Sequence, residues 1–357
     1  MRSAPWTWRE LLERLEREGL ITSEARSDIQ RALSSESLAD SSPWYIRVLV
    51  GFSAWVAAIL FLASLFGFHI FDSPMSAIII GFIFILITLS VRRYTDHLFL
   101  NQLAFALSLT GQFLLIGGIG AKTESLSLAA SAAIILECLL LIGYPDPIHR
   151  FFSVIFSFAA IVVVVYDLDI ANAIHLLILL AAGGGLFGWE REAAFLSGKY
   201  AEFFAPIGYG LTTVLFFLLI PSILPNLPVS SWWASTIGLL LLLLALETHL
   251  LVFHQIAITQ PIGILLFIGT VLISIPFYAA PGVIAAFLVL LLGFHRGNQL
   301  LMGLACMFLV VFLVAFYYHL DLTLLAKSAI LIISGVGLIG LRFLFKQFVQ
   351  QPSNHHA

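Results

Sequence analysis

Apolar runs of about 17 to 25 residues, separated by short polar or turn-forming segments, repeat along this chain from residue 46 onward. A helix rises about 1.5 Å per residue, so about 20 apolar residues cross the hydrocarbon core of a bilayer. The pattern therefore predicts an all-α fold, a polytopic helical membrane bundle of about 12 transmembrane helices. We expect these helices over residues 46–70, 75–91, 98–119, 125–143, 150–166, 170–189, 201–220, 232–253, 259–275, 277–294, 299–318 and 323–345.

The segments 259–275 and 277–294 are the least regular of the series, because Pro276 and Pro281 interrupt them. Proline removes a backbone donor and disfavours a continuous helix. Each segment is either a full span, or the two together form a re-entrant or broken helix.

The positions of the basic residues predict how the bundle sits in the membrane. With the N-terminus in the cytoplasm, only Lys122 and Lys327 of the 17 Lys and Arg residues fall on the outer side. Cytoplasmic loops are enriched in Lys and Arg, so we expect an N-in/C-in orientation. The transmembrane domain then covers residues 43–346, and residues 347–357 form a cytoplasmic tail.

The polar residues 1–42 are expected to form a cytoplasmic helical hairpin and a linker. Gly19 is typical of a helix end, and Thr22 of the cap of a second helix. Glu13 and Arg17 are spaced as an ion pair within the first helix. Four apolar side chains lie on one face of that helix as a docking stripe: Trp8, Leu11, Leu12 and Leu15.

A segment this short cannot bury a hydrophobic core by itself. The docking stripe is therefore expected to pack against another surface. Either it docks on the protein's own membrane domain, or it binds a partner protein or the membrane surface. Both alternatives stay open.

Composition excludes a soluble protein, since 61% of the residues are hydrophobic and 10% are charged, against about 25% charged in soluble domains. Walker, nucleophile-elbow and HExxH patterns do not occur, and no basic patch suggests nucleic acid. We expect no enzyme activity, no catalytic residue, no cofactor and no metal site. Cys138 and Cys306 lie in apolar runs and are expected to be buried, unpaired side chains.

Ionisable residues within the predicted spans are candidates for function, because a membrane tolerates them poorly. Glu137 and Glu247 lie in the cytoplasmic halves of their spans and could carry a proton or neutralise a cation in transit. His249 could extend such a relay. The alternative is that both glutamates make structural polar contacts between helices.

Three further features concern polar and small residues within the predicted spans. His175 is either a hydrogen-bonded structural side chain or a metal ligand, and no second ligand stands at helical spacing. Gln112 is expected to join helices by hydrogen bonds. The glycines at 183, 184, 185 and 188 either allow close helix packing or form a hinge.

Asp321 and Lys327 lie at the predicted outer mouth, between the last two spans. Asp321 can cap the last helix, and Lys327 can reach outward to Asp321 or to lipid headgroups. The alternative is an external gate for an ion or ligand.

Two ends of the chain resemble a known family. The run FYYHLDLTLLAKSAILIISGVGLIGLRFLF (316–345), with ELLERLEREGLITSEA (10–25) and WYIRVLVGFSAWVAAILFL (44–62), resembles a bacterial integral-membrane family known only as a domain of unknown function, type 4401, related to type 2157. The resemblance implies a bacterial cell inner-membrane protein that acts beside a membrane-anchored protein partner. The resemblance identifies no catalytic residue in this chain. Four residues occupy positions of the family's motif and have no known role in the family: Asp321, Thr323, Lys327 and Arg342.

Two functions follow as hypotheses. The first is a non-enzymatic integral membrane protein that contacts the lipid bilayer and acts with a membrane partner. The second is a proton-coupled small-solute transporter or channel that uses the intramembrane Glu and His residues.

Overall fold

The computed structural model describes residues 8–27, 29, 44–67, 73–94, 97–223 and 231–319, and the single residues 325, 328, 332, 336, 339 and 340. Every regular element in these ranges is a helix, as predicted. The elements are α1 (Trp8–Arg17), α3 (Trp44–Gly67), α4 (Pro74–Tyr94), α5 (Leu98–Thr123), α6 (Leu126–Gly143), α7 (Pro147–Asp167), η1 (Ala171–Ala173), α8 (Ile174–Glu190), α9 (Glu192–Leu196), α10 (Ala201–Leu219), η2 (Ile220–Ile223), α11 (Trp233–Phe253), α12 (Pro261–Ser274), η3 (Ile275–Phe277), α13 (Pro281–Arg296) and α14 (Gln299–His319).

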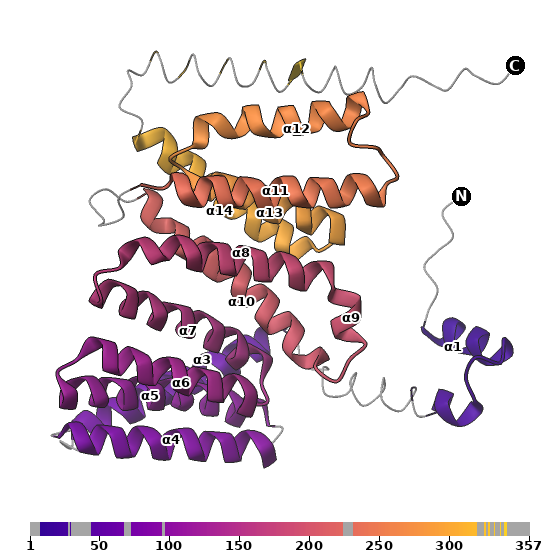
Figure 1. Cartoon of the computed structure of the whole chain (residues 1–357). Coiled ribbons are helices and arrows are strands. Elements are labelled where there is room, and N and C mark those ends of the chain that lie inside the picture. Colours follow the sequence, from indigo (N-terminus) through magenta and orange to yellow (C-terminus); the bar gives the residue numbers. More distant parts are fainter. Residues whose placement is uncertain are drawn as a thin grey trace, which may run out of the picture.

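The long helices lie side by side in a stack (Figure 1). At one end α4 packs on α5, and α5 also contacts α3 and α6. Helix α7 contacts both α6 and α10, and α10 continues to α8 and α13. Helices α11 to α14 form the other end of the stack. Short connections between consecutive helices favour such antiparallel neighbours.

Eight helices among the described residues are long and apolar enough to cross a membrane. Helix α3 has 24 residues. Helices α12 and α13 have 14 and 16 residues, and thus extend about 21 and 24 Å, less than a bilayer core of about 30 Å. The segment 323–345 lies outside the described residues except at single positions. The count of twelve spans and the N-in/C-in orientation therefore stay predictions.

The largest core cluster surrounds α13, where Val283, Ile284 and Ala285 are fully buried. Phe216 of α10 stacks on Phe308 of α14, with ring centroids 4.4 Å apart. The outward faces of the helices carry many exposed apolar side chains, which is compatible with contact to lipid.

Of two predictions about small side chains, the one for the cysteines is wrong. Cys138 and Cys306 are exposed and not buried. The predicted packing of the glycines at 183, 184, 185 and 188 is found at two of them. A Cβ atom at Gly184 would meet Leu211 of α10 at 3.4 Å and one at Gly188 would meet Phe204 at 3.9 Å, both ordinary contacts, whereas one at Gly183 or Gly185 would meet nothing within 4 Å. Closer contact occurs at Gly81 and Gly111, where α4 and α5 approach backbone to backbone.

The N-terminal hairpin forms much as predicted. Gly19 adopts a left-handed φ of +68° after α1, and the Thr22 hydroxyl accepts a hydrogen bond from the Ala25 N–H at 3.2 Å. Leu12 of the docking stripe is 6% exposed and Leu15 is half-buried. The side chains of Trp8 and Leu11 lie outside the described residues.

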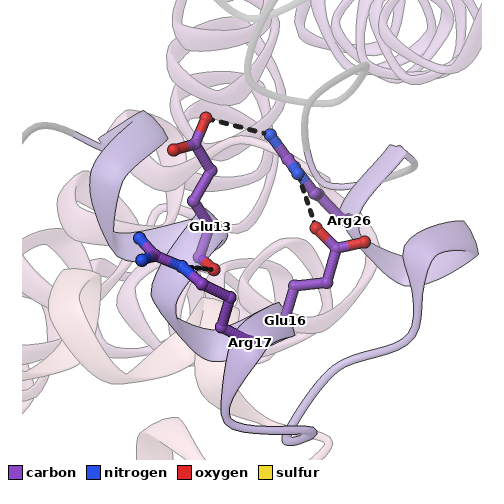
Figure 2. A network of polar contacts seen from close by, with 4 residues as sticks. All are labelled: Glu13, Glu16, Arg17 and Arg26. Atoms are coloured by element: carbon purple, nitrogen blue, oxygen red, sulfur yellow. Dashed lines mark hydrogen bonds and ion pairs between the residues drawn. The ribbon is translucent and has the colours of Figure 1, made fainter.

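The predicted ion pair between Glu13 and Arg17 is wrong. The Arg17 Nε donates to the backbone oxygen of Glu13, and the Glu13 carboxylate pairs with Arg26 at 3.3 Å. Arg26 also pairs with Glu16 at 2.5 Å, so it joins the two helical segments of the hairpin (Figure 2). The hydrogen bond to Glu16 raises the pKa of Arg26, and the guanidinium stays charged.

Replacing Arg26 with Ala is expected to loosen the hairpin, because one guanidinium joins two carboxylates of α1. Hydrogen exchange of the intact protein should show faster exchange of backbone amides in residues 8–27. The matched control is Arg14→Ala, which removes an exposed pair with Glu18, the residue after α1, and leaves both ion pairs of Arg26 in place. Equal exchange in both variants would contradict the role of Arg26.

Candidate functional site

A buried polar network lies between α5, α6 and α7. Its side chains are at most 2% exposed: Ser108 and Gln112 from α5, Glu137 from α6, and His149 and Ser153 from α7. Pro147 occupies the first turn of α7, where proline is well tolerated. The Asp146 carboxylate caps this turn by accepting hydrogen bonds from the N–H groups of Ile148 and His149. The cap fixes the backbone that places His149 in the network.

Hydrogen bonds connect these side chains in a series, in which each group donates to the next one toward Glu137. The Gln112 amide donates to Nε2 of His149 at 3.1 Å, and the Ser108 hydroxyl lies 3.0 Å from the same atom. Since Nε2 accepts, the neutral imidazole carries its proton on Nδ1. Nδ1 lies 3.3 Å from the Ser153 hydroxyl, and Ser153 forms a side-chain hydrogen bond with Glu137. The chain therefore ends at a carboxylate.

The second carboxylate oxygen of Glu137, Oε2, is buried without a hydrogen-bond partner. A buried carboxylate is strongly destabilised as an anion unless it is paired. Arg92 of α4 pairs with Asp146, and Arg150 of α7 pairs with Glu202. Within the described residues Glu137 thus has no ion pair, and Oε2 is free to take up a proton.

Tyr144 closes one side of the imidazole. Its ring stacks on His149 with centroids 4.0 Å apart and an angle of 16° between the planes. The Tyr144 hydroxyl is buried without a hydrogen-bond partner. Burial, and to a lesser extent the charge of Asp146, raises the pKa of Tyr144 well above its ordinary value. The phenol therefore keeps its proton.

Tyr144→Phe is expected to make the protein less sensitive to alkali. Because the folded-state pKa of Tyr144 is raised, its contribution to stability is complete below about pH 10 and is lost as the pH rises through the folded-state pKa. The melting temperature of the wild type should fall more steeply above about pH 10 than that of the variant. If the melting temperatures of the wild type and the variant fell equally with rising pH, this prediction would be contradicted.

The other predicted residues lie in separate clusters. Glu247 on α11 accepts a hydrogen bond from Thr270 of α12, and Figure 1 shows α7, α8 and α10 between α6 and α11. His249 has a 55% exposed side chain and lies 3.2 Å from Glu190 of α8. The structure therefore does not join Glu137, Glu247 and His249 into one site.

His175 of α8 lies 2.6 Å from the Ser235 hydroxyl of α11, so it does join two helices by a hydrogen bond. Asp321 and Lys327 lie outside the described residues. No group of three or more His, Cys, Asp or Glu side chains within the described ranges is arranged to hold a metal ion.

The network contains one residue that sequence reasoning missed. His149 lies one residue before the predicted span 150–166, but α7 begins at Pro147 and therefore includes it. The pair Asp146-Pro147 was the available signal, because it is typical of a helix start. The prediction that Gln112 joins helices is confirmed, since its amide reaches His149.

Comparison with curated proteins found no match, and comparison with solved structures found none. One family model matches residues 43–348, most of the chain, including all helices of the polar network. The chain therefore belongs to the family described as Domain of unknown function (DUF4401).

Proposed function

We propose that this integral membrane protein couples the movement of a small solute to protons, and that Glu137 takes up the proton. The observation that carries the proposal is the chain from Gln112 through His149 and Ser153 to a carboxylate with one unpartnered oxygen. Unpaired acids inside membrane bundles mark proton and ion pathways. The membrane would be the inner membrane of a bacterium, as the family resemblance implies, and no enzymatic step is required.

Four side chains of the network, together with Tyr144, have separate parts in this proposal. A proton arriving at Nε2 of His149 lets the Nδ1 proton pass to the Ser153 hydroxyl. The Ser153 proton then passes to Glu137, and the imidazole is left neutral. Gln112 holds the imidazole in the required orientation, and the stacked ring of Tyr144 restricts its rotation.

The test is proton flux in proteoliposomes under an imposed pH gradient, read by a pH-sensitive dye inside the vesicles. Ser153→Ala breaks the chain but leaves both the imidazole and the carboxylate, so we expect flux to fall at least about tenfold. Ser157→Ala, one turn further along α7, is the matched control and should keep wild-type flux. Wild-type vesicles that conduct no better than protein-free vesicles would overturn the proposal.

A second role, assembly with a membrane-anchored protein partner, is supported by an apolar side chain on the hairpin. Leu20, in the turn that follows α1, is 67% exposed. Leu20→Ser is expected to reduce recovery of a partner in a pull-down of the intact protein from its native membrane. Leu12 is unsuitable for this test, because it is buried and its replacement would disturb the hairpin. Recovery of the same proteins with the wild type and with Leu20→Ser would show that Leu20 does not contribute to partner binding.

A further inference from the structure

A second buried carboxylate, Glu247, lies far from the polar network. Its side chain is 7% exposed. The Thr270 hydroxyl of the neighbouring helix α12 donates to its Oε1, and its Oε2 is buried without a hydrogen-bond partner. A buried carboxylate with one satisfied and one unsatisfied oxygen is destabilised as an anion.

The surroundings of Glu247 match those of Glu137. Each glutamate lies near the end of its helix, in the similar segments AIILECLLLIG (133–143) and LLALETHLLVF (243–253). Each forms a hydrogen bond with a hydroxyl of the next helix in the chain, Ser153 of α7 or Thr270 of α12. Each leaves Oε2 buried and without a partner. The same chemistry therefore occurs twice in the bundle.

Helix α11 packs against α8, α12 and α13, and the charged groups at this end of them have other contacts. On α8, the Oε2 atom of Glu190 lies 3.2 Å from Nδ1 of His249, and its Oε1 atom is buried without a hydrogen-bond partner. On α13, Arg296 pairs with Glu192, and the ring of His295 lies near His249 and Phe253. In the described part of the chain, no ion pair reaches Glu247.

We propose that Glu247 and Thr270 form a second proton-binding site, separate from the network of Glu137. A proton on Oε2 removes the buried charge while Oε1 keeps its hydrogen bond from Thr270. A metal cation fits less well, because hard cations take about six or more oxygen ligands. The oxygens shown at Glu247 are its own two and the Thr270 hydroxyl, since the Thr270 carbonyl already accepts from Ser274.

Dicyclohexylcarbodiimide tests this site, because it reacts with protonated carboxyl groups in apolar surroundings. The intact protein in lipid vesicles is treated at about pH 7, and each modified residue is identified by peptide mass spectrometry. We expect adducts at Glu137 and at Glu247, and none at Glu192, which is paired with Arg296. An adduct at Glu247 with none at Glu137 would support this inference and contradict the proposed function. No adduct at Glu247 would overturn the inference.

Variants of Thr270 separate proton binding from a purely structural contact. Thr270→Val removes the hydroxyl that stabilises the ionised carboxylate and keeps the side-chain shape, so Glu247 should be modified at least about twofold faster at pH 8. Thr270→Ser restores the donor and should keep the wild-type rate. Equal rates in all three proteins, with unchanged elution in size-exclusion chromatography, would overturn the inference.

Discussion

Glu137→Gln is expected to lower proton flux to the level of protein-free vesicles. Glutamine has nearly the shape of glutamate, and its carbonyl oxygen can still accept the hydrogen bond from Ser153. It cannot bind or release a proton in this pH range. The change therefore removes the one titratable end of the chain that starts at Gln112, while the packing of α6 against α7 is kept. Dye-reported flux under an imposed pH gradient measures the loss.

Two further variants show whether the acid itself is required. Glu137→Asp keeps a carboxyl group but shortens its reach to Ser153, so we expect flux between those of the wild type and the Gln variant. Glu192→Gln, which changes an acid paired with Arg296 outside the network, should leave flux unchanged. Wild-type flux in Glu137→Gln would show that the proton does not pass through this residue.

Gly111→Ala is expected to destabilise the bundle at the contact between α4 and α5. A Cβ atom at position 111 would lie 2.8 Å from the backbone oxygen of Gly81 and 3.0 Å from Cβ of Phe84. Backbone atoms cannot turn aside as side chains can, so the two helices must separate. Such overpacking costs about 1–3 kcal/mol. Thermal unfolding of the protein in detergent should show a lower melting temperature.

Gly117→Ala is the matched control on the same helix. A Cβ atom there would meet nothing within 4 Å, and alanine favours a helix by about 1 kcal/mol over glycine. We expect this variant to melt at the wild-type temperature or above it. If both variants melted alike, close approach of α4 and α5 at Gly111 would not limit stability.

Local signals in the sequence predicted local structure well. Gly19 and Thr22 mark the end of one helix and the start of the next, because a left-handed residue and a capping hydroxyl act on neighbouring backbone groups. The apolar runs predicted the long helices for a similar reason, since the cost of placing a side chain in lipid depends mainly on its own type. The prolines that made this region ambiguous lie where the short helices end and begin, since α12 ends at Ser274 before Pro276 and α13 begins at Pro281.

Local signals could not predict which residues distant in the sequence contact one another. Helical spacing predicts an ion pair between Glu13 and Arg17, but the Glu13 carboxylate pairs with Arg26 across the hairpin. Glu137 stood out as an acid in an apolar run, yet its connection to His149 through Ser153 depends on which faces of α6 and α7 meet.

The sequence by itself determined that this is an all-helical protein with several helices suited to a membrane, because transfer of apolar side chains out of water is nearly independent of their neighbours. Only the tertiary structure decided which polar side chains meet. That choice depends on close packing between helices, as at Gly81 and Gly111, and such complementarity of shape is a property of pairs of surfaces. The separate positions of Glu137 and Glu247, each with its own hydroxyl donor, result from that packing.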